Sequence, residues 1–157
     1  MIYLLLYVDD MLIAAKSMCD IQNLKIFLNG EFDMKDLGAA KKILGMEIYR
    51  DRTQKKLFLS QKDYIQKILV RFGMADSKSI STPLSEKEKL SAMIKAQAQA
   101  DQDYMSKVPY SSVVGNLMYA MVCTRPDLAC VVSMVSRFLN QPQKEHWKAV
   151  KRIFIYL

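Results

Sequence analysis

Two adjacent carboxylates, Asp9 and Asp10, stand between two apolar runs near the start of the chain, residues 2–6 and 11–15. Each run has five residues and is bounded by polar ones, which predicts two short buried strands joined by a tight hairpin. Both acids would then project from one turn, where a divalent cation would remove the repulsion and desolvation cost of unpaired carboxylates. Carboxylate oxygens suit Mg²⁺ or Mn²⁺. The pair is therefore a candidate metal site, although Asp is also a common turn residue.

The elements that would position this hairpin follow it in the sequence. Asp20 is expected to cap a helix whose apolar residues recur at helical spacing and which would pack on the hairpin. A second hairpin is predicted from strands over 46–50 and 55–59, and Gly45 before them would mark a bulge or a close backbone approach. Residues 1–60 are thus expected to form antiparallel sheet with one helix on a face.

The remainder of the chain has helical patterns. Ser60 to Asp63 fit a capping box, and the apolar stripe that follows predicts an amphipathic helix ending at Gly73. Residues 78–108 are rich in Ser, Lys, Glu, Ala and Gln, which favours a linker or mobile loop and hence a domain boundary. Beyond it, three helices are predicted, over 110–121, 125–139 and 144–157. The expected fold class is therefore α+β.

Composition indicates a globular protein with an anionic partner. Of the 157 residues 51% are hydrophobic, and the formal net charge is +7 with a pI near 9.3. Residues 41–78 hold ten Lys or Arg against four Asp or Glu, so most of the excess charge lies there. Such a stretch suits a phosphate backbone, but a basic surface alone also fits a membrane or a merely solvated face.

Several other classes are disfavoured. Cys19, Cys123 and Cys130 have no zinc-ligand spacing with each other or with His146, and an odd number of cysteines fits buried, reduced thiols in an intracellular protein. No basic segment precedes the first apolar run, so that run does not resemble a secretory leader. No run reaches the roughly 18 apolar residues of a membrane span. We therefore expect a soluble protein that does not bind a membrane.

Seven short motifs give the chain a resemblance, over almost its whole length, to the reverse transcriptases of Ty1/Copia-type long-terminal-repeat retrotransposons. The motifs are Tyr7-Val8-Asp9-Asp10, Phe32-Asp33-Met34-Lys35-Asp36-Leu37-Gly38, Leu44-Gly45-Met46-Glu47-Ile48, Leu59-Ser60-Gln61 with Tyr64-Ile65, Ser81-Thr82-Pro83-Leu84, Tyr110-Ser111-Ser112 with Val114-Gly115-Asn116-Leu117-Met118-Tyr119, and Thr124-Arg125-Pro126-Asp127. Any one of these motifs is weak evidence for the family, whereas seven of them in the order in which the family has them are specific evidence.

The resemblance implies part of a right-hand polymerase. Residues 1–60 would be a partial palm with the catalytic hairpin and a primer-grip-like segment. Residues 61–77 would be a thumb-like helix, 78–108 a linker, and 109–157 a helical connection towards a ribonuclease H domain. The implied reaction is RNA-directed DNA synthesis on an RNA or DNA template-primer, from a deoxynucleoside triphosphate and two Mg²⁺ or Mn²⁺ ions about 4 Å apart.

The resemblance also implies roles for individual residues. Asp9 would bind metal directly, Asp10 would support it, and Lys35 is a candidate acid that protonates pyrophosphate. Nucleic acid would be contacted by the hairpin, by the primer-grip-like segment and by basic side chains: Tyr7, Val8, Leu44, Gly45, Met46, Lys55, Lys56, Lys62, Lys67 and Arg71. For the three basic residues of the thumb-like helix, a solvated face is the ordinary alternative.

In this family a further metal-binding Asp and the nucleotide-binding fingers precede the hairpin. Residues 1–157 are therefore expected to be one part of a Pol polyprotein, acting in a cytoplasmic virus-like particle, and to be inactive alone. Two alternatives remain open. One is a noncatalytic nucleic-acid-binding fragment that uses residues 41–78 for phosphate contacts. The other is a retrotransposon relic without function.

Overall fold

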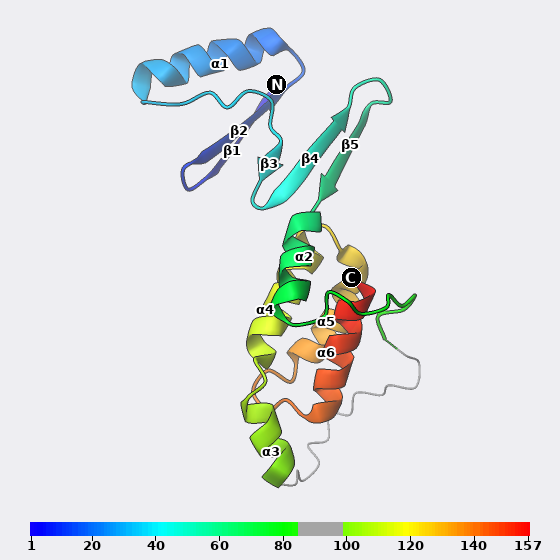
Figure 1. The fold of residues 1–157 in the computed structure, drawn as a ribbon. Helices are drawn as coiled ribbons and strands as arrows, with labels where there is room; N and C mark the ends of the chain where they lie inside the picture. The colour runs from blue at the N-terminus through cyan, green and yellow to red at the C-terminus, as the bar shows by residue number, and fades with distance from the viewer. Residues whose placement is uncertain (85–98) are drawn as a thin grey trace. The chain divides into compact units, whose positions relative to one another are not determined.

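The computed structural model describes residues 1–84 and 99–157, which form two compact units, Met1–Ser60 and Gln61–Leu157 (Figure 1). The first unit contains two small antiparallel sheets and a helix, and the second contains helices. The chain is therefore a mixed α+β protein, as its sequence patterns predict.

The first two strands form the predicted hairpin. Strands β1 (Ile2–Tyr7) and β2 (Asp10–Ala15) pair antiparallel in a two-stranded sheet. The prediction that these strands are buried is wrong, because every residue of β1 is exposed and β2 is only partly covered. Among the described residues no third strand joins this sheet, and a two-stranded ribbon alone covers little of its own surface.

Helix α1 (Met18–Glu31) follows the hairpin and contacts β2, as predicted. Its N-cap is Ser17, whose hydroxyl accepts a hydrogen bond from the Cys19 N–H at 3.2 Å. The prediction of Asp20 as the cap is therefore wrong. Asp20 lies in the first turn, where its negative charge interacts favourably with the positive end of the helix dipole.

The second sheet has the order β3-β4-β5, with strands β3 (Lys42–Ile43), β4 (Met46–Asp51) and β5 (Lys56–Ser60), and all its pairs are antiparallel. Strands β4 and β5 match the predicted hairpin. Gly45 does not form a bulge: it shares a two-residue turn with Leu44, and the two have φ values of 73° and 49°. Two positive φ angles favour glycine and are typical of the tight turns that join twisted strands.

The second unit contains five α-helices and one short 3₁₀ helix in its described residues. They are α2 (Lys62–Arg71), α3 (Gln99–Ser106), α4 (Tyr110–Cys123), η1 (Pro126–Leu128), α5 (Ala129–Ser136) and α6 (Lys144–Tyr156). The core is built mainly from apolar side chains of α4, α5 and α6. The helices predicted over 110–121 and 144–157 are confirmed, whereas the one predicted over 125–139 is divided into η1 and a shorter α5.

Helix α2 packs with the helices that follow it. The ring centroid of Phe72, its C-cap, lies 5.6 Å from that of Phe154, and Ile68 belongs to the same core. Its N-cap is Gln61, whose side chain makes no capping hydrogen bond, so the predicted capping box is wrong. Gln61 is instead 2% exposed and its Oε1 accepts a hydrogen bond from the Thr124 hydroxyl at 2.7 Å.

Part of the predicted linker over 78–108 is ordered structure. Residues 99–106 form α3, and Met105 is buried in the core of the second unit. The part of the linker over 85–98 lies outside the described residues. The structure divides the chain after Ser60, whereas length and composition alone favour a boundary inside the linker.

The three thiols are free, but the prediction that they are buried is wrong. Cys19 and Cys130 are exposed, and Cys123 is partly buried. In residues 1–84 and 99–157, none of the helices is both long enough and apolar enough to span a bilayer.

Candidate metal-binding hairpin and nucleic-acid interface

The hairpin between β1 and β2 places the two aspartates next to each other at its tip. Val8 and Asp9 form a two-residue loop, and Asp10 opens β2 opposite Tyr7. Val8 has a φ of 50° and is 78% exposed. A positive φ is unusual for a β-branched residue and costs on the order of 1–3 kcal/mol. The strained loop residue therefore lies directly beside the two carboxylates.

The donor set of this tip suits a hard divalent cation, but it is small. Asp9 and Asp10 are both exposed, so their charges are hydrated and the burial penalty inferred from the sequence does not arise in this chain. In the described parts of the chain, no group of three or more His, Cys, Asp or Glu side chains is arranged to hold a metal ion. The two aspartates would thus provide two ligands, and water would complete the coordination.

Lys35 lies in the irregular segment after α1 and is exposed. Its neighbour Asp36 accepts hydrogen bonds from Lys25 Nζ on both carboxylate oxygens at 2.8 Å and from the Gly38 N–H at 2.8 Å. The hydrogen bond from Lys25 is the main cause that lowers the pKa of Asp36. Within the described residues no ion pair joins Lys35 to either hairpin aspartate.

The sequence interpretation missed Lys25, which anchors this motif to α1. The two partners are eleven residues apart, and no local repeat connects a helical lysine with an aspartate in the loop that follows. Only the backbone path after Glu31 brings them together.

The candidate nucleic-acid residues of the second sheet lie at opposite ends of β4. The Leu44-Gly45 turn and Met46 are at its start, whereas Lys55 ends the turn that follows β4 and Lys56 begins β5. Six residues of extended strand span about 20 Å. The structure therefore does not bring the primer-grip-like segment and the two lysines together.

The turn that carries the lysines is organised by Asp51. Its Oδ1 accepts hydrogen bonds from the Thr53 N–H at 2.9 Å, the Thr53 hydroxyl at 2.7 Å and the Gln54 N–H at 2.9 Å. These bonds, led by that from the Thr53 side chain, lower the pKa of Asp51. Lys55 takes a φ of 54°, and both it and Lys56 are exposed. The turn thus presents two ammonium groups to solvent.

Three further candidates, Lys62, Lys67 and Arg71, are exposed on α2, which belongs to the second unit. The Arg71 guanidinium carbon lies 5.6 Å from the centre of the Phe72 ring. The basic stretch over 41–78 is therefore divided between the two compact units.

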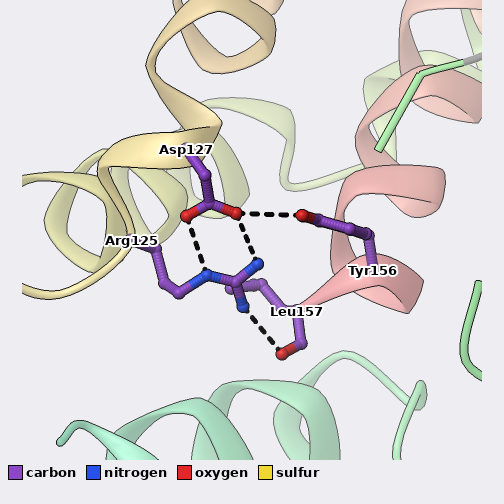
Figure 2. Close-up of polar contacts among 4 residues, drawn as sticks. All are labelled: Arg125, Asp127, Tyr156 and Leu157. Carbon is purple, nitrogen blue, oxygen red and sulfur yellow. Dashed lines mark hydrogen bonds and ion pairs between the residues drawn. The ribbon is translucent and has the colours of Figure 1, made fainter. Parts of the chain in front are cut away.

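The motif over 124–127 forms a polar cluster in the second unit, and the sequence interpretation missed its partners. Figure 2 shows Arg125 paired with both oxygens of Asp127, through Nε at 2.9 Å and an η nitrogen at 2.8 Å. Its other η nitrogen donates to the Leu157 carbonyl at 3.0 Å, and the Tyr156 hydroxyl donates to Asp127 at 3.1 Å. The motif therefore ties η1 to the end of α6, and its role is structural.

The Arg125 hydrogen bonds are the main cause that lowers the pKa of Asp127, and this makes its contribution to stability depend on pH. Because the folded pKa is below the unfolded value, the stabilisation is present above the ordinary Asp pKa of about 3.9 and is lost as pH falls through the folded pKa. We expect Asp127→Asn to lower the free energy of unfolding at pH 7 by at most about 1 kcal/mol, since the pair is partly exposed. Urea titrations at pH 7 and below pH 3 measure this, and a deficit as large at the lower pH would contradict it.

Comparisons with known proteins show the family to which the chain belongs. Residues 1–86 match the family described as reverse transcriptase (RNA-dependent DNA polymerase). The chain is 57% identical to the retrovirus-related Pol polyprotein from transposon TNT 1-94 of Nicotiana tabacum over 156 residues. This match covers 99% of this chain and 12% of that protein. It is 35% identical over 156 residues to the Pol polyprotein from transposon RE1 of Arabidopsis thaliana, covering 99% of this chain and 10% of that one.

A third relative is a putative transposon Ty5-1 protein of Saccharomyces cerevisiae, which is 33% identical over 157 residues, covering 99% of this chain and 48% of that protein. The comparison with solved structures gave no significant match.

The chain belongs to the reverse transcriptase (RNA-dependent DNA polymerase) family. Within that family it is similar to the reverse transcriptase region of Pol polyproteins of the Ty1/Copia type. It spans only 12% and 10% of the two Pol polyproteins named above.

Proposed function

We propose that the β1–β2 hairpin is the metal-binding turn of a polymerase site that copies RNA into DNA. The observation that carries this proposal is the tight two-residue loop that holds Asp9 and Asp10 side by side in a chain of the reverse transcriptase family. In it, residues 1–60 are part of the palm, 61–77 a thumb-like helix, and 109–157 a connection. Primer extension by a chain that also carries the upstream palm and fingers tests the proposal.

The aspartates have distinct roles in this proposal. Asp9 is the direct ligand and Asp10 the supporting one, and bound Mg²⁺ or Mn²⁺ supplies activation of the primer hydroxyl and neutralisation of the triphosphate. Tyr7 and Val8 line the hairpin against the primer terminus and template. Lys35 is the proposed donor of a proton to pyrophosphate, which requires that its ammonium approach the hairpin when the nucleotide is bound.

Contacts with the template-primer are proposed for both units. The turn at Leu44, Gly45 and Met46 would contact the primer, while Lys55, Lys56 and the basic residues of α2 would contact phosphates. The complete enzyme would further include the rest of the Pol polyprotein. The upstream palm would complete the metal site, the upstream fingers would bind the nucleotide, and a ribonuclease H domain would follow downstream. We propose that it acts in a cytoplasmic virus-like particle.

A second candidate function is nucleic-acid binding without catalysis. It is favoured by the small donor set, because residues 1–84 and 99–157 hold no cluster of three acidic, Cys or His side chains suited to a metal. The exposed lysines of the β4–β5 turn would then act by charge alone.

Metal binding at the hairpin distinguishes the polymerase function from nucleic-acid binding without catalysis. We expect Mn²⁺ to bind weakly to residues 1–157, and Asp9→Asn to weaken binding about thirtyfold, since a dication and a carboxylate about 4 Å apart attract by about 2 kcal/mol in water. Electron paramagnetic resonance of free Mn²⁺ measures this. Asp76→Asn, at an exposed turn of the second unit, is the charge-matched control. If both variants bind like the parent, the assignment of Asp9 is wrong.

Binding to a primer-template duplex should be electrostatic and should weaken steeply with salt. Each phosphate contact contributes a slope of about −0.9 in a plot of log affinity against log salt concentration, so Lys55→Ala with Lys56→Ala should reduce the slope by about 1.8. Fluorescence anisotropy between 50 and 200 mM salt, about the range in which such contacts are lost, measures it. The control removes two exposed lysines elsewhere, Lys16 and Lys107. Affinity that does not depend on salt would contradict the prediction.

A further inference from the structure

The outer row of helix α6 combines lysines with a tryptophan. Lys144, Trp147, Lys148 and Lys151 follow one another at spacings of three, one and three residues, which places them along one side of a helix. The other side of the helix packs in the core of the second unit, where Ala149, Val150, Ile153 and Phe154 are buried. We call the four residues the α6 row.

The α6 row places charged groups over aromatic rings. The Lys151 Nζ lies 5.9 Å from the centre of the Trp147 ring, and the Lys144 Nζ lies 5.1 Å from the centre of the Tyr104 ring of α3. Tyr104 is 44% exposed, while Trp147 is partly buried against the core. The core therefore packs against part of Trp147, and the rest of this side chain remains accessible to solvent, with the Lys151 ammonium near its ring.

The charge of this surface is positive. Helix α6 contains four Lys or Arg against a single acid, Glu145. Asp101 of α3 already pairs with Lys144, which leaves Lys148 and Lys151 as the cations of the row best placed to meet an anionic ligand. Neither residue lies in the basic stretch over 41–78, and neither has a part in the polymerase site described above.

We propose that the α6 row binds single-stranded nucleic acid, with an unpaired base stacked on Trp147 and phosphates contacted by Lys148 and Lys151. Base stacking on an anchored aromatic ring combined with nearby cations is how single strands are bound without sequence preference. In a duplex the bases stack on one another and their faces are not available. The simpler alternative is a core tryptophan beneath solvated lysines, which would contact no ligand. The proposal goes beyond the polymerase site and does not depend on its metal.

Trp147 provides its own probe, because it is the single tryptophan of the chain. We expect a single-stranded oligothymidylate, added to residues 1–157, to quench the Trp147 emission in a saturable way. A hairpin duplex of equal charge should quench it far less. Anisotropy of the labelled oligonucleotide, recorded in parallel, reports binding anywhere on the chain and so separates this surface from the basic stretch over 41–78.

Matched variants assign the contacts. Lys148→Ala with Lys151→Ala should reduce the salt slope of single-strand binding by about 1.4, at about 0.7 per contact. Lys16→Ala with Lys107→Ala removes the same charge at exposed positions elsewhere and should leave the quenched fraction at saturation unchanged. Trp147→Leu should weaken binding by about fivefold or more, the lower limit for loss of one stacked base, whereas Trp147→Phe should retain most of the affinity. Circular dichroism shows whether the variants keep their helices.

Several outcomes would overturn the proposal. Oligonucleotide binding that leaves Trp147 emission unchanged excludes stacking there, while a role for residues 41–78 would stand. Quenching that persists unaltered in the Lys148→Ala, Lys151→Ala variant removes the two lysines from the site. Equal quenching by single strand and duplex, or no binding at all, also contradicts it. The metal titration and primer extension are unaffected by these results, so failure of this surface is distinguishable from failure of the polymerase proposal.

Discussion

Residues 1–157 alone should incorporate no nucleotide in a primer-extension assay, and should extend the primer once an upstream palm and fingers are fused before Met1. The natural donor of that segment is the TNT 1-94 Pol polyprotein, which is 57% identical to this chain over 156 residues. In the fusion, Asp9→Asn should lower the rate by at least about two decades, the usual effect of removing one element of a preorganised electrostatic site.

The physical reason is the number and position of fixed charges. Asp9 and Asp10 lie on one exposed turn, and two carboxylates from one turn do not define the separation of two cations. Phosphoryl transfer is accelerated mainly by positioning and by charge stabilisation, with little contribution from covalent chemistry by the protein. A donor set that leaves the metals unfixed therefore loses most of the rate, even where a single cation binds.

Two controls make the assay decisive. Asp76→Asn in the fusion should extend primers like the parent, because Asp76 is an exposed turn residue of the second unit. The donor segment alone should be inactive. Incorporation by residues 1–157 without the fusion would refute the dependence, and a fusion in which Asp9→Asn is as fast as the parent would refute the metal-ligand role of Asp9.

Phe154→Ala should produce the largest loss of stability among single substitutions in the helical unit. Phe154 is 1% exposed, and its ring packs edge-on against that of Phe72 from α2. Truncating a buried Phe to Ala typically costs about 3–5 kcal/mol, which is a large share of the roughly 5–15 kcal/mol by which domains are stable. Urea unfolding followed by Trp147 emission measures the second unit, since Trp147 lies in it.

Val122→Ala provides a control within the same unit. Val122 on α4 is 76% exposed, so its truncation should change stability by no more than about 0.5 kcal/mol. If Phe154→Ala and Val122→Ala shift the urea midpoint equally, Phe154 does not anchor α2 to the helical core. Loss of α2 packing would in turn expose Ile68 and Phe72, so increased binding of a hydrophobic dye to the Phe154→Ala variant is expected as well.

The sequence by itself determined the features that depend on neighbouring residues. The apolar runs on either side of Asp9 and Asp10 predict two strands and a tight turn because strand propensity and turn length are local. The stripes of α4 and α6 predict their buried faces because a helix repeats every 3.6 residues. The candidate metal pair and the family therefore follow from the amino-acid sequence alone.

The tertiary structure alone decided which elements pack together and which surfaces remain open. The Thr124–Gln61 hydrogen bond joins residues 63 positions apart, and Arg125 reaches the Leu157 carbonyl across 32. The periodicity of apolar residues does not predict such pairs, because each partner fits the pattern of its own helix or loop regardless of where the other partner lies. The exposure of β1 and the position of Lys144 over the Tyr104 ring of α3 likewise depend on which segments the fold brings together. A side chain is buried only if the fold places other elements against it. A strand pattern predicts which side chains are apolar enough to be buried, but it does not predict whether any element covers them.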